Sequence, residues 1–135
     1  MAFSVNSTIR VRYGETDSMG YAHHGNYPLY FEEGRTELIR KLGTDYKYME
    51  EMGILMPVVS LEIKYLAPVY YDDVLTIKTT LLELPVVKII FEYEITNVKD
   101  EVVCRANTML AFVDAQSRKP IRAPEWFLSL VKKAL

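Results

Sequence analysis

The clearest pattern in the chain is a helical stripe that begins at Tyr27 and ends near Leu42. Apolar or small residues recur there every three or four positions, which is the period of a helix with one buried face. Pro28 falls in the predicted first turn, where its missing N–H costs little, and Gly43 is the expected stop. Asn26 is the predicted N-cap, because its side-chain oxygen can accept a hydrogen bond from a first-turn N–H. We therefore predict a long amphipathic helix.

Most of the remaining chain alternates apolar and polar residues with a period of two, which predicts strands. The predicted strands span Ser7–Tyr13, Val59–Leu66, Val74–Leu84, Val87–Ile95 and Val102–Val113. Shorter helices are predicted at Asp45–Met52 and Pro124–Leu135, and a hairpin turn at Asn97–Glu101. One dominant helix and about five strands joined by short turns predict an α+β fold, with an antiparallel sheet covered on one face.

The second face of the predicted sheet is mixed. Lys64 and Lys78 on that face suit solvent, whereas Ile90 and Met109 do not. A single sheet also leaves two open edges, which are prone to pair with another chain. Self-association through an edge or through this face would resolve both problems, so we expect a homo-oligomer.

Composition narrows the class of protein. A chain of 135 residues, half apolar and one-quarter charged, predicts a single globular domain over 1–135. A net charge of -2 gives no reason to expect nucleic acid or an anionic membrane as a partner. The single cysteine, Cys104, excludes an internal disulfide and suits a buried thiol in a reducing compartment. There is no signal-peptide pattern and no apolar run of the ~18 residues needed to span a bilayer, so we expect a cytoplasmic protein.

The candidate chemistry lies just ahead of the long helix. Asp17, His23 and His24 fall in a loop that also contains Gly20 and Gly25. A helix N-terminus has unpaired N–H groups that can stabilise an oxyanion, and a nearby carboxylate can act as nucleophile or base. This arrangement fits hydrolysis of an activated acyl group. The pattern fits equally well a structural Asp17 that only caps a turn.

The residues around this loop resemble the signature of the hotdog-fold acyl-CoA thioesterases. The matching positions are Tyr13, Thr16, Asp17, Gly20, His24, Asn26, Tyr27, Tyr30, Glu32 and Arg35. Within that superfamily the chain is most similar to the 4-hydroxybenzoyl-CoA thioesterase branch, and in particular to the Tol-Pal-associated acyl-CoA thioesterases. The likeness continues through Ile63–Pro68, Asp72–Asp73 and Asp114–Pro124, so it covers most of the chain.

The resemblance implies an antiparallel sheet of five or six strands wrapped around a long central helix. It also implies two subunits joined into one continuous sheet, with active sites where they meet. Asp17 matches the catalytic carboxylate, and the backbone N–H at or next to Gly25 would polarise the thioester carbonyl. Tyr13 and His24 match active-site positions; His24 could position water, hold Asp17 ionised, or merely line the loop. His23 has no counterpart, and we expect it to be structural.

The resemblance further implies an acyl-CoA substrate, with an acyl carrier protein as an alternative carrier. Asn26 and Tyr27 are expected to contact the substrate. Arg118 and Lys119 could contact the coenzyme A phosphates, although a solvated basic turn also explains them. We expect no cofactor and no metal, because hydrolysis here needs neither and adjacent histidines on a loop rarely point the same way.

Two other functions stay open at this point. A hydratase or dehydratase on the same fold would use Asp17 and His24 as acid and base at the α and β carbons of the acyl group. A non-catalytic acyl-CoA-binding subunit would keep the fold without turnover. We predict instead an acyl-CoA thioesterase that assembles as a dimer or a homotetramer.

Overall fold

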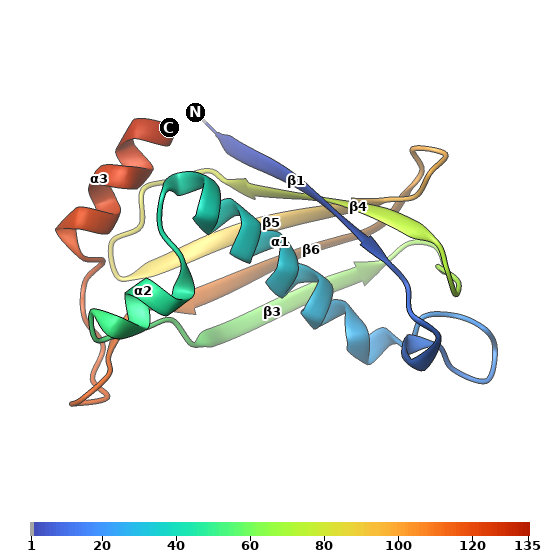
Figure 1. Cartoon of the computed structure of the whole chain (residues 1–135), viewed down its shortest axis with the longest axis horizontal. Coiled ribbons are helices and arrows are strands. Elements are labelled where there is room, and N and C mark those ends of the chain that lie inside the picture. Colours follow the sequence, from blue (N-terminus) through green and yellow to red (C-terminus); the bar gives the residue numbers. More distant parts are fainter. Residues whose placement is uncertain (1) are drawn as a thin grey trace.

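The computed structural model describes residues 2–135 and contains a five-stranded antiparallel sheet with one helix lying across it (Figure 1). The sheet strands are β1 (Phe3–Arg10), β3 (Val58–Tyr65), β4 (Val74–Leu81), β5 (Lys88–Thr96) and β6 (Val102–Ala111), in the order β1-β4-β5-β6-β3. A second, two-stranded sheet pairs β2 (Ile54–Leu55) with β7 (Val113–Asp114). The helices are η1 (Tyr13–Glu15), η2 (His24–Asn26), α1 (Tyr27–Leu42), α2 (Tyr46–Glu51) and α3 (Glu125–Ala134). The predicted α+β fold is confirmed.

Helix α1 forms where the sequence pattern predicts it, although it is not long. It has 16 residues, which corresponds to about 24 Å. Its apolar stripe is buried against the sheet, with Tyr30, Phe31 and Leu38 each at most 4% exposed. Gly43 ends the helix with a φ of 108°, and its N–H bonds to the carbonyls of the last turn. The helix packs on β1, β4 and β5.

Gly34 sets how closely α1 approaches the sheet. A Cβ at this position would lie 2.3 Å from Thr79 Oγ1 and 3.1 Å from Ile77 Cγ2 on β4. Both β4 residues are fully buried. The absence of a side chain at Gly34 therefore lets the helix rest directly on the strand.

The first strand differs from the prediction of Ser7–Tyr13. It spans Phe3–Arg10 instead, and Tyr13 is 78% exposed rather than on the buried face. The chain leaves the sheet after Arg10 because the Arg12 N–H bonds to the Glu15 carboxylate, which forms the turn η1. The predicted strand at Val74–Leu84 also ends earlier, at Leu81.

Strand β3 is an edge of the sheet and is exposed on both sides. Its inward residues Leu61 and Tyr65 are 39% and 48% exposed, because α1 packs mainly on β1, β4 and β5. The sequence predicted the two faces of β3 but could not show that neither is covered within one chain. No helix of residues 2–135 is long and apolar enough to cross a membrane.

Candidate active site

The loop before α1 is a narrow hairpin. Thr16 and Ala22 form an antiparallel bridge, the Asp17 N–H donates to Tyr21 O at 2.8 Å, and the His23 N–H donates to Glu15 O at 2.7 Å. Extended residues advance ~3.3 Å each, so Asp17 lies within about 7 Å of the bond that joins Glu15 to His23. The hairpin therefore brings Asp17 next to the segment that opens the helix.

The Asp17 carboxylate uses one oxygen for structure. Its Oδ1 accepts hydrogen bonds from the main-chain N–H groups of Met19 (2.9 Å) and Tyr21 (3.3 Å). Within residues 2–135, Oδ2 accepts no hydrogen bond and Asp17 forms no ion pair. A carboxylate has two acceptor oxygens, so capping the turn leaves one free for chemistry. The two roles that the sequence left open for Asp17 are thus compatible.

The helix start is capped by His23, not by Asn26. The Gly25 N–H donates to His23 Nδ1 at 3.0 Å, and the Asn26 N–H donates to His23 O at 3.0 Å. Our prediction for the Asn26 side chain was wrong: its Nδ2 donates to Glu15 O at 2.8 Å, because the 3-10 turn η2 extends the helix beyond that residue. Among the described residues, the His24 N–H has no acceptor. The Gly25 N–H is therefore already hydrogen-bonded, whereas the neighbouring His24 N–H is open, in the sense that it has no acceptor among the described residues.

His24 and Tyr27 connect the loop to the edge strand. The Tyr65 hydroxyl of β3 donates to His24 O at 3.0 Å, and its ring packs edge-on against Tyr27 at 4.9 Å. The His24 ring stacks on His23, with centroids 4.3 Å apart, and no hydrogen bond joins it to Asp17 within the described chain. Tyr27 is 3% exposed, and its burial, reinforced by Cys104 and Tyr65, raises its pKa to about 12, so its hydroxyl stays neutral.

Three predicted site residues are exposed, and two of them lie far from the loop. The exposed Tyr13 ring packs edge-on against Tyr71 at 5.5 Å. Arg118 and Lys119 are exposed in a turn that the Asp114 carboxylate holds through main-chain N–H groups. Figure 1 shows this turn in orange-red at the opposite end of the molecule from the blue loop. One chain therefore does not bring Arg118 and Lys119 to Asp17.

Glu15 is a site residue that sequence reasoning missed. It is only 8% exposed, and its carboxylate bonds to Arg12 and to Tyr30 on α1. The signal that could have found it is an acid three residues after Arg12 and two before Asp17, a spacing that suits a local ion pair across a turn.

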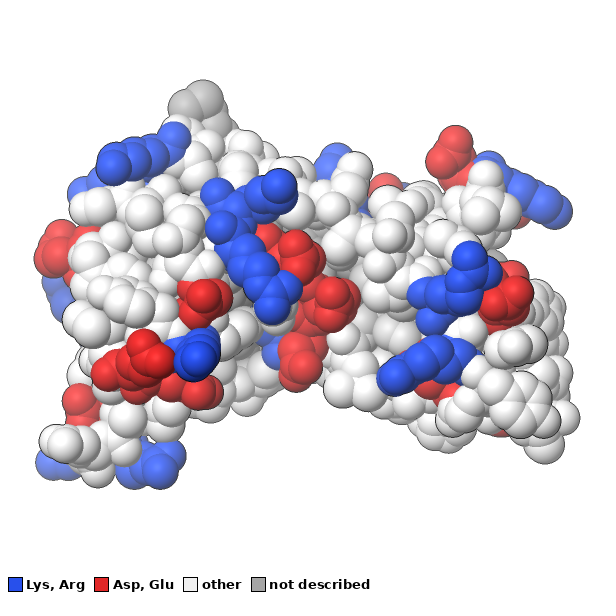
Figure 2. All heavy atoms as spheres, in the orientation of Figure 1, with Lys and Arg blue, Asp and Glu red and all other residues white. Residues whose placement is uncertain are grey.

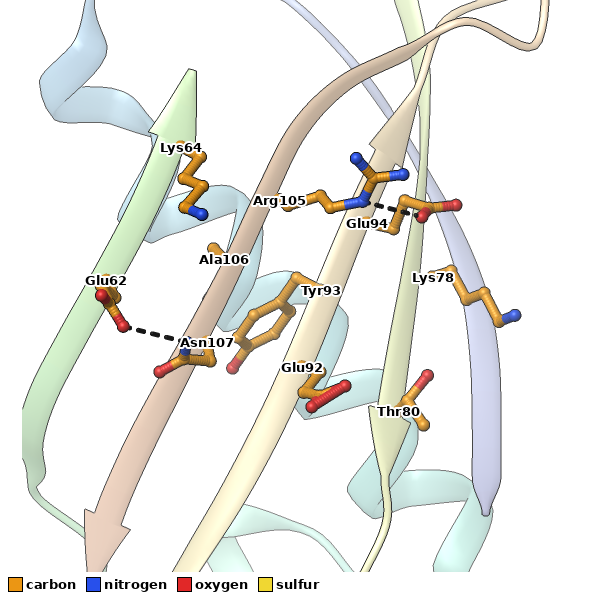
Figure 3. A pocket seen from close by; sticks show the side chains of 10 residues that line it. All are labelled: Glu62, Lys64, Lys78, Thr80, Glu92, Tyr93, Glu94, Arg105, Ala106 and Asn107. Atoms are coloured by element: carbon orange, nitrogen blue, oxygen red, sulfur yellow. Dashed lines mark hydrogen bonds and ion pairs between the residues drawn. The ribbon is translucent and has the colours of Figure 1, made fainter. Parts of the chain in front are cut away.

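A broad hollow of the surface lies away from this loop. It has a volume of about 460 Å³ and lies on the face of the sheet away from α1 (Figure 3). Its polar side chains pair with one another, as Arg105 does with Glu94 at 3.4 Å and Asn107 with Glu62 at 3.4 Å. On the face seen in Figure 2, acidic and basic side chains are likewise interspersed. These features describe a solvated polar surface.

A cavity of about 370 Å³ lies beside α1 and α2. Its lining includes Arg35, Tyr46, Ile54 and Met56. Arg35 is 8% exposed and its Nε donates to the Tyr46 hydroxyl at 3.1 Å. Arg35 follows His24, whose amide is open, by eleven residues, which places it ~17 Å along the helix axis from that amide. Within residues 2–135, no group of three His, Cys, Asp or Glu side chains could hold a metal ion.

Comparison with known proteins shows the family to which the chain belongs. The family model described as "Thioesterase-like superfamily" matches residues 11–131. The chain is 38% identical to the putative acyl-CoA thioesterase YneP of Bacillus subtilis, over 92% of this chain and 93% of that protein. It is 34% identical to the DHNA-CoA thioesterase of Staphylococcus aureus, whose structure superposes with a TM-score of 0.90 over 96% of this chain and 89% of that one.

A more distant likeness concerns the fold alone. A 4-hydroxybenzoyl-CoA thioesterase complexed with 4-hydroxybenzoyl CoA superposes with a TM-score of 0.84, over 94% of this chain and 97% of that one. The identity is 22%. This likeness shows that the two chains share one fold.

Proposed function

This chain belongs to the thioesterase-like superfamily, and from that membership we propose that it hydrolyses acyl-CoA to a free carboxylic acid and coenzyme A. The protein is a thioester hydrolase with the hotdog fold. The roles of individual residues, the assembly and the acyl group are the proposed parts. Residues 1–135 act as a single hotdog domain with Asp17 at its reacting centre.

The reaction needs an attacking oxygen and a donor for the carbonyl. Asp17 Oδ2 either removes a proton from a water molecule or attacks the carbonyl carbon itself. In the first case the water oxygen forms the new C–O bond, the C–S bond breaks, and the thiolate takes up the proton. In the second case Oδ2 forms a C–O bond to the carbonyl carbon and the C–S bond breaks, which gives an acyl–Asp17 anhydride and the thiolate. Water then hydrolyses the anhydride, which releases the acid, restores the Asp17 carboxylate and supplies the proton that the thiolate takes up. In both cases the carbonyl oxygen gains negative charge, which a backbone N–H can stabilise.

The observation that carries this proposal is the pair of open groups on one hairpin. Asp17 has a free carboxylate oxygen, and the His24 N–H, next to the occupied Gly25 N–H, has no acceptor within residues 2–135. The positive end of the helix dipole favours charge at this amide. His24 then contributes through its main chain, while its ring, stacked on His23, is available to contact water or substrate.

Substrate contacts come from the helix start and from a second subunit. We propose that Asn26 and Tyr27 border the thioester and that the cavity at Met56 receives the acyl chain. The turn with Arg118 and Lys119 lies at the opposite end of the molecule from the Asp17 loop of the same chain. These two residues can therefore contact a coenzyme A bound at that loop only from a neighbouring copy in a dimer or a homotetramer. The exposed β3 edge supports such pairing. An acyl carrier protein is the alternative carrier of the acyl group.

The test is release of free thiol from short, long and aromatic acyl-CoAs. Asp17→Asn keeps an oxygen for the Met19 and Tyr21 amides but removes the base or nucleophile, so we expect kcat to fall at least ~100-fold. The matched control is Asp45→Asn, which makes the same change at a carboxylate that caps α2 through the Tyr48 N–H at 2.7 Å. It should retain full activity.

The same samples distinguish the rival functions. A kcat for Asp17→Asn within about twofold of the unmodified protein would remove Asp17 from the mechanism. Tight acyl-CoA binding with no thiol release by the unmodified protein would indicate a non-catalytic subunit. A change in enoyl-CoA absorbance on incubation would indicate a hydratase or dehydratase.

A further inference from the structure

The buried residue Glu15 lies next to the proposed reacting groups, two residues before Asp17. Its Oε1 accepts hydrogen bonds from the Arg12 N–H at 2.9 Å and from the Tyr30 hydroxyl at 3.0 Å. Its Oε2 accepts from Arg12 Nε at 3.1 Å and Nη2 at 3.0 Å. The side chain of Glu15 is 10% exposed, whereas that of Arg12 is 77% exposed. Both carboxylate oxygens are therefore fully engaged within the chain.

The main chain of the same residue holds the other arm of the hairpin. Glu15 O accepts from the His23 N–H at 2.7 Å and from Asn26 Nδ2 at 2.8 Å. One residue thus ties together the turn before Asp17, the segment that ends the loop, and the first turns of α1 through Tyr30. Asp17 is two residues beyond this junction on one arm, and the open His24 amide is one residue beyond it on the other.

The negative charge of Glu15 is required by its surroundings. Burial alone raises the pKa of this carboxyl, but the bonds from the Arg12 backbone and guanidinium and from Tyr30 outweigh it, so the pKa is lowered. Burial and the bond to Glu15 also raise the pKa of Tyr30, which keeps its hydroxyl a donor. All four hydrogen bonds to the carboxylate come from N–H or O–H donors. A glutamine at this position would place its NH2 group, itself a donor, opposite one of these donors, and that hydrogen bond would be lost.

We propose that Glu15 is a positioning residue for thioester hydrolysis, which fixes the Asp17 carboxylate relative to the His24 amide through its bonds to Tyr30, His23 and Asn26. The inference rests on the proposed function. Reacting groups must be held closely, since a displacement of about 1 Å can cost ~100-fold in rate. Glu15 touches neither substrate nor water in this role; it acts through the groups that do.

Tyr30→Phe is the sharpest variant, because it removes a single hydroxyl and keeps the ring. The matched control is Tyr93→Phe. Tyr93 is 3% exposed, like Tyr30 at 4%, and its hydroxyl bonds to Thr108 Oγ1 at 2.6 Å on β5 and β6. Both variants lose one buried tyrosine bond, but only the first touches Glu15. We expect similar shifts in melting temperature, with kcat about tenfold lower in Tyr30→Phe and unchanged in Tyr93→Phe.

Glu15→Gln keeps the shape of the side chain and removes its charge. We expect kcat to fall about 100-fold with KM within about twofold, because the reacting groups and not the substrate contacts are displaced. Amide hydrogen exchange supplies a readout independent of turnover. The His23 and Tyr21 amides should exchange faster in Glu15→Gln, while amides in the middle of α1 keep their protection.

The outcomes separate this inference from the proposed function. If the unmodified protein releases no thiol from any acyl-CoA, the proposed function fails and the role of Glu15 in hydrolysis fails with it, even if faster loop exchange in Glu15→Gln shows that Glu15 orders the hairpin. If the unmodified protein is active, a normal kcat in Glu15→Gln would overturn the positioning role alone. Equal loss of kcat in Tyr30→Phe and Tyr93→Phe, in proportion to their loss of stability, would also overturn it.

Discussion

The contact between Gly34 and β4 allows a stability prediction whose size follows from the structure. In Gly34→Ala the new Cβ would lie 2.3 Å from Thr79 Oγ1. Folded proteins essentially never show a Cβ contact below 3.0 Å, so helix and strand must separate by about 0.7 Å. Neither Thr79 nor the nearby Ile77 can move aside into solvent, because both are fully buried.

Two opposing terms set the magnitude. Alanine in a helix interior is favoured over glycine by ~1 kcal/mol. Forcing an extra group into a packed core costs up to ~3 kcal/mol. We therefore expect Gly34→Ala to lower the free energy of unfolding by about 2 kcal/mol, contrary to what helix propensity alone predicts. At a slope of about 2 kcal/mol/M, the urea midpoint would fall by about 1 M.

Thr79→Ala is the companion variant. Within residues 2–135, Thr79 Oγ1 is buried without a hydrogen-bond partner, so its removal sacrifices no bond there and vacates the space that the methyl group introduced by Gly34→Ala needs. The double variant should be more stable than Gly34→Ala by at least ~1 kcal/mol, which is a positive coupling in a double-mutant cycle. Urea unfolding followed by circular dichroism measures all four proteins. A Gly34→Ala midpoint at or above that of the unmodified chain, or the absence of rescue by Thr79→Ala, would refute the close-packing argument.

The remaining predictions concern pH. Burial raises the pKa of Cys104 from 9.0 to about 12, so the stability that depends on its neutral thiol is complete below pH 9 and is lost as the pH rises toward 12. Cys104→Ala should therefore lose less unfolding free energy over that range than the unmodified protein. The native thiol should also react slowly with a disulfide reagent at pH 8. The pKa of Glu15 is lowered below 4.5, so the contribution of its charge to stability is present above pH 4.5 and is lost as the pH falls through the folded pKa. The difference in unfolding free energy between the unmodified protein and Glu15→Gln, measured by urea unfolding, should therefore shrink as the pH falls. A difference that stays constant with pH would contradict the lowered pKa.

The sequence predicted those features that depend on repeating patterns. The helical stripe from Tyr27 and the stop at Gly43 were predictable because burial and backbone conformation select residue types at regular spacing. The loop signature around Asp17 likewise led to the correct superfamily. The end of β1 was not predictable, because the alternation continues through Val11 while a side-chain bond to Glu15 turns the chain away.

The details of the site depend on contacts between distant or irregular residues. Asparagine is a residue type favoured at N-caps, but the extra turn η2 places the cap at His23, and the side-chain amide of Asn26 serves as a donor instead. The spacing of Glu15 from Arg12 suggests a local ion pair but does not show that the acid is buried, because its carboxylate also bonds to Tyr30, fifteen residues later. The exposure of β3 depends on which strands α1 covers, which is a property of packing and not of local pattern.

The hairpin and helix start form one uninterrupted stretch of chain, from Arg12 to Tyr30, with its own internal network of hydrogen bonds. The cavity beside α1 is lined in part by Ile54 and Met56, which belong to a separate stretch. Substitutions that enlarge or narrow that cavity leave the internal network intact. On the proposed function, descendants of such a chain can therefore diverge in the acid they release while keeping the same reacting groups, and a graft of the Arg12–Tyr30 stretch into a relative should carry its chemistry with it.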